Sequence, residues 1–426
     1  MRTKRVAALL SAVLVTAACH ASPLWAGRPD VTPRGQTQQP RRVDPHSAIV
    51  RWKANSLLTS RQKALGGLRL ATRRQFPALN ATSVALSAEQ APSNIAGKLM
   101  ATGLVDSIEP NGIWQLPARR PSVRSLSLRI RNEAPPDDPA RAWGQKKIGL
   151  EAVWPFVRGD RKVVVAVIDT GVDLNHPDLR GALVPGYSTF DEPGPQDYQG
   201  HGTHVTGIIV GQNQGRPGVR GVAPGCRVMP VKVMGPRGRE GRVENVVAGL
   251  LWAVDHGATI VNMSLGDEGT SALLRDAVRY AQEKDVLVVA ASGNFEEGRH
   301  RSANTMNYPA AFPGVMAVGA TSDDDQRADF SFYGHWMSIA APGVEIYSSI
   351  PAQGNESGAY EYEQGTSMAA PFVSGVAALL RSRFPQWTAR QVQQRLEKTA
   401  QDFGPSGFDE EYGHGRIDAQ RALLGP

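Results

Sequence analysis

Over the last two thirds of the chain, short apolar runs rich in β-branched residues alternate with stretches that have the apolar spacing of amphipathic helices. The runs predict strands buried on both faces, and their alternation with helices predicts a parallel sheet covered on both sides, an α/β architecture. The predicted strands are 162–169, 227–234, 258–266, 285–294 and 314–321, and the predicted helices are 204–211, 243–257 and 272–285.

A different pattern occupies residues 46–118. The segments SAIVRW (47–52) and ATSVALS (81–87) predict strands, and VDSIEPNGIWQL (105–116) predicts a final strand or hairpin. Between them lie two helical patterns, at 56–68 and 91–103. Together these segments predict a small α+β unit ahead of the larger domain.

Two polar, proline-containing stretches divide the chain. Residues 23–45 have the composition of a linker, and residues 119–136 are basic and end in two prolines, as expected of an exposed connector. The expected organisation is a leader over 1–22, the linker, the α+β unit over 46–118, the connector, and the α/β domain over 137–426.

The first residues have the composition of an export signal. Three basic residues precede an apolar stretch from Val6 to Ala18, which suits a signal peptide and is too short to span a bilayer. The ending VTAAC resembles a bacterial lipoprotein signal, which would place a lipid on Cys19. Thr16 fits that motif poorly, so ordinary cleavage nearby is the favoured alternative. We expect an exported protein, anchored to a membrane only if Cys19 is lipidated.

The charge distribution and the number of cysteines limit which partners and cross-links we expect. Residues 1–136 hold 20 Lys and Arg against 6 Asp and Glu, and residues 137–426 hold 27 against 34, giving +14 and −7. The net charge of +7 therefore describes neither part and does not indicate a nucleic-acid partner. Opposite charges instead predict that the two parts attract each other. With only Cys19 and Cys226 in the sequence, we expect no disulfide.

Four polar residues lie at predicted strand ends or helix starts. In parallel sheets, ligands bind at the carboxyl ends of the strands. Asp169 ends the most apolar strand, Asn294 follows another, His201 lies between two glycines, and Ser367 begins an apolar helix. Singly, each is better explained as a turn or cap residue. A metal pair of His201 with His204 is a weak alternative, because no Glu or Cys completes a zinc pattern and His204 should face the interior.

Together, the four residues match the needs of nucleophilic acyl transfer. That chemistry takes a hydroxyl, a base, a carboxylate that orients the base, and donors for the oxyanion, and Ser367, His201, Asp169 and Asn294 supply one each. The helix start at Ser367 adds unpaired N–H groups and a partial positive charge. Pro371 is expected within the first turn, where its missing N–H costs least.

The segments VIDTGVDLNHPDL, GHGTHVTGII, VNMSLG, AASGN and GTSMAAPFVSGVAALL, in this order, resemble the subtilisin-like serine peptidases over about residues 137–426. The chain order Asp, His, Ser is also that of the family. The resemblance implies a three-layer α/β domain with a mostly parallel, seven-stranded sheet. It also implies a serine endopeptidase in which Ser367 is the nucleophile, His201 the general base and then acid, and Asp169 its orienting partner. Asn294 and the Ser367 N–H would form the oxyanion hole.

The resemblance further implies a cleft whose backbone pairs with the substrate as an added strand. The segment after Asn294 should shape the first specificity pocket, and its mixed charges lead us to expect broad specificity. The walls would be Ser264, Leu265 and Gly266 on one side, Ala291, Ser292 and Gly293 opposite, and Gly238 to Gly241 on the far side.

The same family needs no cofactor for its chemistry but often binds structural calcium. Asp178 matches one acidic ligand, and Asp138 matches another less securely because the spacing to Trp143 is shortened. Gly215 stands where subtilisin has an Asn ligand. Because calcium takes six to eight oxygens, we expect a weakened or absent site.

Residues 46–118 resemble the inhibitory, ferredoxin-like propeptides of this family. That predicts a zymogen that processes itself between about Arg119 and Asp137; an accessory domain retained in the mature protein is the alternative. The expected partners are protein or peptide substrates and the chain's own propeptide, and we expect a monomer. A non-catalytic peptide-binding protein is disfavoured by the complete triad, whereas transpeptidation through the same acyl-enzyme stays open.

Overall fold

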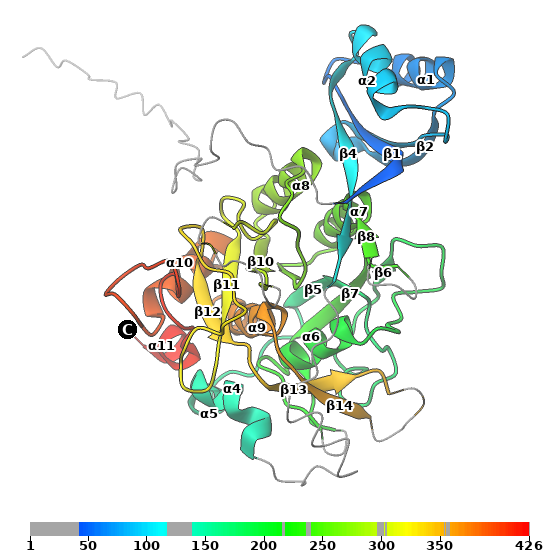
Figure 1. Cartoon of the computed structure of the whole chain (residues 1–426). Coiled ribbons are helices and arrows are strands. Elements are labelled where there is room, and N and C mark those ends of the chain that lie inside the picture. The colour runs from blue at the N-terminus through cyan, green and yellow to red at the C-terminus, as the bar shows by residue number, and fades with distance from the viewer. Residues whose placement is uncertain are drawn as a thin grey trace, which may run out of the picture. The chain divides into compact units, whose positions relative to one another are not determined.

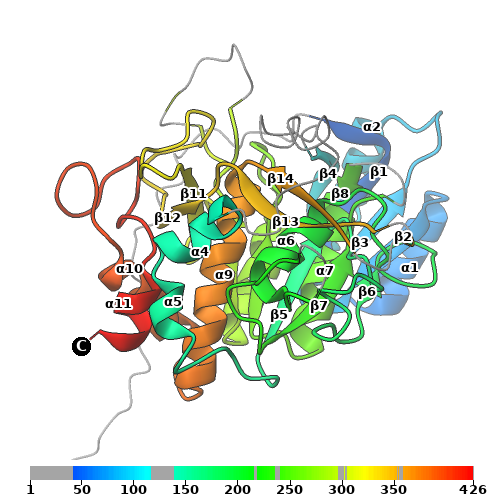
Figure 2. The ribbon, with the colours of Figure 1, turned by 90° about the horizontal axis from the view of Figure 1, so that it is seen from below.

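The computed structural model describes residues 42–116 and 139–425, apart from 215–217, 236–239, 296–301, 303–304, 353 and 355–357. The leader, the connector and all but the end of the expected linker therefore lie outside the described residues. Figures 1 and 2 show the ribbon in two orientations.

Seven parallel strands form the central sheet, in the order β12-β11-β10-β9-β5-β7-β6. All five strands expected in this domain are confirmed. The family resemblance implied seven strands, but the hydrophobic pattern did not locate the other two, because β6 has only two residues and β12 is short and ends in proline. The strands are β5 (Val164–Asp169), β6 (Tyr187–Ser188), β7 (Arg227–Lys232), β9 (Ile260–Met263), β10 (Leu287–Ala291), β11 (Met316–Thr321) and β12 (Ile339–Pro342).

Helices cover both faces of this sheet and complete the three layers. In β5, Val165 and Val167 belong to one buried cluster, and Ala166 and Ile168 belong to another. This two-residue period, with both faces buried, explains why the strand is continuously apolar. The first cluster includes α6 (His201–Val210) and α9 (Thr366–Arg383), and the second includes α7 (Val243–Asp255) and α8 (Ala272–Glu283).

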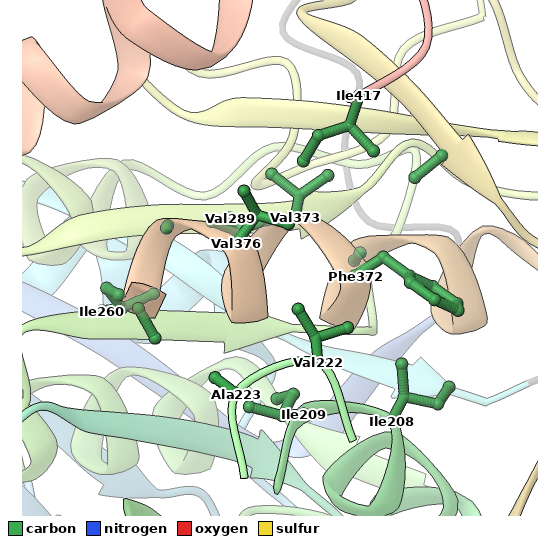
Figure 3. Packing of buried hydrophobic residues seen from close by; sticks show 14 of the residues in the cluster. Ile208, Ile209, Val222, Ala223, Ile260, Val289, Phe372, Val373, Val376 and Ile417 are labelled. Atoms are coloured by element: carbon green, nitrogen blue, oxygen red, sulfur yellow. The ribbon is translucent and has the colours of Figure 1, made fainter. Parts of the chain in front are cut away.

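Helix α9 is buried from Thr366 to Arg381. In Figure 3, Ile208 and Val222 lie below the helix and Ile417 lies above it. A helix that is apolar all round belongs in the interior, where packing contacts hold it from every side. Ser367 is therefore carried at the start of a rigidly packed element.

Shorter elements surround this core, and β13 and β14 pair as an antiparallel hairpin. Among the described helices, none combines the length and apolar character needed to cross a bilayer. The remaining elements are η2 (Pro139–Ala142), α4 (Trp143–Lys147), α5 (Leu150–Val153), α10 (Ala389–Thr399), α11 (Ala419–Leu424), β13 (Ile346–Ile350) and β14 (Ala359–Glu363).

The N-terminal unit has the element order βαββαβ and an antiparallel sheet in the order β2-β3-β1-β4, a ferredoxin-like arrangement. Its own buried cluster includes Val50, Val84 and Leu99. The elements are β1 (Val43–Trp52), α1 (Leu58–Gly67), β2 (Ala71–Phe76), η1 (Pro77–Leu79), β3 (Ala81–Ala85), α2 (Pro92–Ala101) and β4 (Val105–Gln115).

Three details of this unit differ from the sequence expectation. Strand β2 was missed because ATRRQF has only one buried residue, Phe76, and so no apolar period. Strand β1 begins at Val43, inside the segment expected to be linker. The segment 105–116 forms one long strand rather than a hairpin.

Strand β4 continues beyond its own unit and pairs antiparallel with β8 (Glu240–Arg242), with Trp114 opposite Gly241 (Figure 1). Trp114 is 1% exposed and belongs to the cluster that includes α7 and α8. The N-terminal unit is therefore joined to the larger domain by backbone pairing and by a buried aromatic side chain.

Candidate active site

Strand β5 ends on Asp169 and helix α6 begins on His201, which brings both side chains to the same edge of the sheet. His201 Nδ1 lies 2.9 and 3.0 Å from the two carboxylate oxygens of Asp169. Because a carboxylate only accepts, this contact places the imidazole proton on Nδ1 and leaves Nε2 to accept. Asp169 is fully buried and is also held by the Thr170 N–H at 2.7 Å.

The environment of His201 favours its protonated form. Burial lowers the pKa of the imidazole, but the charge and hydrogen bond of Asp169, with the carboxylates of Glu363 and Asp197, raise it above the ordinary value of 6.5. A base whose pKa lies near working pH accepts and returns a proton efficiently.

The residues around His201 fix its position. Gly200 has φ of 100°, and a Cβ on Gly202 would lie 2.1 Å from the Gly171 carbonyl oxygen. Asp197, which the sequence analysis missed, accepts from the N–H groups of Gly200 and Thr203 at 2.9 and 3.0 Å. It thereby supplies acceptors to the otherwise unpaired first turn of α6.

Ser367 is the second residue of α9 and follows Gly365, whose φ of 153° favours glycine. Its Oγ donates to the carbonyl oxygen of Ser264 at 3.1 Å. Within the described residues, no hydrogen bond joins Ser367 to His201. Catalytic hydrogen bonds are often unformed before substrate binds, and rotation of one side-chain torsion would redirect Oγ.

Pro371 lies in the second turn of α9, not in the first turn as expected. In a regular helix the N–H at this position would donate to the carbonyl oxygen of Ser367, four residues earlier. That carbonyl instead accepts from Ser264 Oγ at 2.8 Å. Because Pro371 has no N–H, the Ser367 carbonyl oxygen is available to accept from Ser264, a residue of the expected cleft wall.

The Ser264 hydroxyl is itself held in a buried chain of hydrogen bonds. Asn262 Nδ2 donates to Ser264 Oγ at 2.9 Å, and Ser374 Oγ donates to Asn262 Oδ1 at 2.8 Å. The chain runs from α9 through β9 and back to α9. Asn262 and Ser374 lie in the quoted segments VNMSLG and GTSMAAPFVSGVAALL, but these segments did not reveal their hydrogen bonds.

Asn294 follows β10 and faces the start of α9. The Thr366 N–H donates to Asn294 Oδ1 at 3.0 Å, and the Thr366 hydroxyl does so at 3.2 Å. Because an N–H can only donate, this contact fixes which end of the amide is oxygen and makes Nδ2 the donor. A Cβ built on Gly365 would lie 3.6 Å from that Nδ2, which places it beside the Ser367 segment.

Two of the expected cleft walls contact the start of α9, through Ser264 and Gly293. Ser264 contacts it directly, Leu265 is buried in the core, and the Gly293 N–H donates to Thr366 Oγ1 at 3.1 Å. Ser292 is also buried, Gly266 contacts the side chain of Asn307, and Ala291 accepts a hydrogen bond from it. Gly238 lies outside the described residues.

Two of the residues considered as metal ligands, His204 and Asp178, make hydrogen bonds within the described part of the chain. His204 is fully buried and its Nε2 lies 3.1 Å from the Glu361 carbonyl oxygen, which confirms it as a packed histidine. Asp178 accepts from the N–H groups of Gln214 and Val219 and from the Tyr360 hydroxyl. Asp138 lies outside the described residues, among which no three His, Cys, Asp or Glu side chains are grouped to hold a metal.

Comparison with known proteins gives consistent matches. Residues 160–415 match the model of the subtilase family. Subtilisin BL of Lederbergia lenta is 41% identical over 284 residues, which are 66% of this chain and 97% of that protein. Fervidolysin of Fervidobacterium pennivorans is 39% identical over 313 residues, 67% of this chain, and the matched part spans only 44% of fervidolysin.

Two solved structures also match this chain. The crystal structure of fervidolysin, described as a keratinolytic enzyme related to subtilisin, superposes with a TM-score of 0.75 at 29% identity. The match covers 90% of this chain and 61% of that one. A lanthipeptide protease superposes with a TM-score of 0.58 at 28% identity, over 67% of this chain and 94% of that one.

Proposed function

The chain belongs to the subtilase family of serine peptidases, and on that premise we propose that it is an exported endopeptidase of broad specificity, made as a zymogen. The observation that carries the proposal is the contact of His201 with Asp169 at 2.9 Å, beside a serine at the start of a buried helix. Asn294, held by Thr366, supplies an amide donor at the same place.

In the first half-reaction, Ser367 Oγ attacks the carbonyl carbon of the peptide bond while His201 Nε2 takes the hydroxyl proton. The carbonyl oxygen becomes an oxyanion, which accepts from Asn294 Nδ2 and the Ser367 N–H. The C–N bond then breaks, the imidazolium gives its proton to the leaving amine, and the acyl group stays on Ser367 as an ester.

In the second half-reaction, His201 deprotonates a water molecule that attacks the ester carbonyl carbon. The ester C–O bond breaks, Ser367 Oγ regains a proton from the imidazolium, and the carboxylic acid product leaves. An amine that replaced water would yield a new peptide bond, so transpeptidation uses the same residues. Product analysis with an added amine measures that balance.

Turnover of a protein substrate by single variants tests the assignment. Ser367→Ala should leave only residual activity, and Asn294→Ala should lower kcat by ~10²–10³ because one oxyanion donor is lost. Asn175→Ala changes an exposed asparagine and serves as the matched control. Full turnover in Asn294→Ala would remove Asn294 from the mechanism.

We further propose that residues 46–118 act as the inhibitory propeptide. Support comes from β4, whose Trp114 pairs with Gly241 of β8, a residue of the segment Gly238 to Gly241 that is expected to form the far wall of the cleft. Similarity to fervidolysin covers 90% of this chain, which is more than the sheet domain alone comprises. Mass spectrometry of the secreted form tests the proposal: a mature N-terminus between about Arg119 and Asp137 is expected, and one before residue 46 would contradict it.

Complementary charges also support this docking. Arg51 pairs with Asp276, Arg73 Nη2 lies 2.9 Å from Glu244, and Arg242 Nε lies 2.7 Å from Asp44. Glu109 accepts from the N–H groups of Ala272 and Leu273 at 2.8 and 2.9 Å, at the start of α8. A carboxylate there satisfies unpaired donors and the positive end of the helix.

We propose that any structural calcium at Asp178 binds weakly. The described surroundings bring three hydrogen-bond donors to this carboxylate, and calcium needs a shell of six to eight oxygens. The described residues therefore fit the ion poorly. Melting temperatures with calcium and with chelator test this, and a fall of several degrees on chelation would contradict it.

A further inference from the structure

Lys232 is a buried cation to which the proposed reaction assigns no role. It is the last residue of β7, is 1% exposed, and pairs with Asp169 in the parallel register of β5 and β7. Every second residue of a strand points to the same face, so Asp169 shares its face with Val167, and Lys232 shares its face with Val228. Both valines belong to the cluster that includes α6, and Lys232 therefore lies beside Asp169 on the face that α6 covers.

The Lys232 ammonium group contacts the segment 192–198, which leads to α6. Its Nζ donates to the Gln196 carbonyl oxygen at 2.7 Å and lies 3.1 Å from Glu192 Oε1. It also lies 4.9 Å from the centre of the Tyr198 ring, within the range of a cation–π contact. Burying an ammonium group is costly unless such partners accept it, so these contacts stabilise the charge and fix the segment to β7.

The segment that Lys232 contacts also holds the start of α6. Asp197, which follows Gln196, accepts from two N–H groups at the start of α6, where His201 is the first residue. Its own N–H donates to the Val172 carbonyl oxygen at 3.1 Å, just after β5. Backbone and hydrogen bonds therefore run without a break from the Lys232 ammonium group through Asp197 to His201.

We propose that Lys232 is a positioning residue of the peptidase: it fixes the segment 192–198 and thereby the orientation of the His201 imidazole against Asp169. The inference rests on the proposed peptidase function and adds to it a residue that is not itself a reacting group. It differs from a purely structural role, in which loss of the ammonium group would lower stability and leave turnover of the folded protein unchanged.

Removing the ammonium group would take a buried donor from the Gln196 carbonyl oxygen and from the Glu192 carboxylate. The segment is then free to shift, and the His201 imidazole shifts with it. Lys232→Met keeps the apolar stem and should lower kcat about 10²-fold, the cost of misplacing a catalytic group by about 1 Å. KM should stay nearly unchanged, because the segment does not belong to the expected cleft walls.

Two further variants separate positioning from stability. Lys232→Arg keeps the charge and the N–H donors, so it should recover most of the lost kcat. Arg381→Met is the matched control, because Arg381 is a 9% exposed cation that donates to the carbonyl oxygens of Trp387 and Asp285, at the other end of α9 from Ser367. It should lower the free energy of unfolding and leave kcat unchanged.

Steady-state kinetics on a chromogenic peptide and denaturant unfolding are measured on the form that the full chain yields on expression. Active sites are counted by labelling with a serine-directed phosphonate, so that incomplete processing does not imitate a loss of kcat. If Lys232→Met does not fold, Lys232→Gln, whose polar end has a shorter reach, carries the comparison with the same expected loss.

Three outcomes would overturn the inference: an unchanged kcat in the Lys232 variant, a raised KM with kcat unchanged, or an equal loss of kcat in Arg381→Met. Any of these in protein that the phosphonate labels refutes the role of Lys232 alone. Folded, unsubstituted protein that resists labelling refutes the peptidase assignment instead.

Discussion

At the scale of single residues, the Asp169 carboxylate sets the protonation of His201. Because Asp169 raises the pKa of His201 above 6.5, activity should be lost on acidification around a midpoint above that value. Asp169→Asn removes the charge, so the midpoint should move to lower pH while kcat falls on the order of 10⁴-fold. The pH profile of kcat/KM measures both effects. Asp255→Asn, an exposed change, should alter neither, and an unmoved midpoint in Asp169→Asn would count against this pairing.

Ser264, in the expected cleft wall, supports the proposed nucleophile by donating a hydrogen bond to the Ser367 carbonyl oxygen. Ser264→Ala leaves the Ser367 carbonyl without a donor, since Pro371 has no N–H to give. The free energy of unfolding should fall by about 1–3 kcal/mol, and kcat should fall as well. Ser374→Ala breaks the far end of the same chain and should lower stability while preserving kcat. Denaturant titration and steady-state kinetics separate the two, and equal losses of kcat would contradict the anchoring role.

The candidate site was only partly predictable at this scale. The three triad residues and Asn294 lie in distinctive segments at strand ends and helix starts, so their sequence context points to them. Thr366 and Asn262 lie in segments that resemble the family, but they contribute through contacts made only after folding. Their roles depend on which segments the fold brings together, which the local sequence does not specify.

At the scale of elements, the helix that carries Ser367 is fixed by close packing. A Cβ on Gly375 of α9 would lie 2.5 Å from the Val222 Cβ, so Gly375→Ala should destabilise the protein by about 1–3 kcal/mol through overpacking. Gly97 of α2 has nothing within 4 Å of such a Cβ, so Gly97→Ala should stabilise its helix by up to about 1 kcal/mol. Urea unfolding of the full chain, in a Ser367→Ala background, measures both. Effects of the same sign would contradict this account of the packing.

Helices and strands were predictable where their burial gives a recognisable pattern of apolar residues in the sequence. The five strands expected in the larger domain are continuous apolar runs because both of their faces are covered. Strand β2 has one buried residue, and β6 has two residues in all, so neither carries a period that the sequence could reveal. Pro371 was placed one turn too early because the start of α9 depends on the backbone at Gly365.

At the scale of the whole molecule, opposite charges hold the N-terminal unit against α7 and α8. If this unit inhibits the enzyme, activity should appear only after a delay in which the unit is released. Added salt should weaken the ion pairs that hold the unit and so shorten this lag. Asp276→Asn removes the partner of Arg51 and should shorten the lag already at low salt. Glu283→Gln, on the exposed face of α8, is the matched control.

Time courses of activity in about 0.05 and about 0.5 M NaCl measure this effect, because the Debye length falls roughly threefold between those concentrations. A lag that neither salt nor Asp276→Asn changes would argue against electrostatic docking of the N-terminal unit.

The central claim is that Ser367 is a nucleophile activated by His201, and its reaction with a serine-directed phosphonate tests this most directly. Intact mass and peptide mapping should show one adduct per chain, on Ser367, and none in Ser367→Ala or His201→Ala. A correctly folded, processed chain that forms no adduct would contradict the claim and would instead favour a non-catalytic peptide-binding protein.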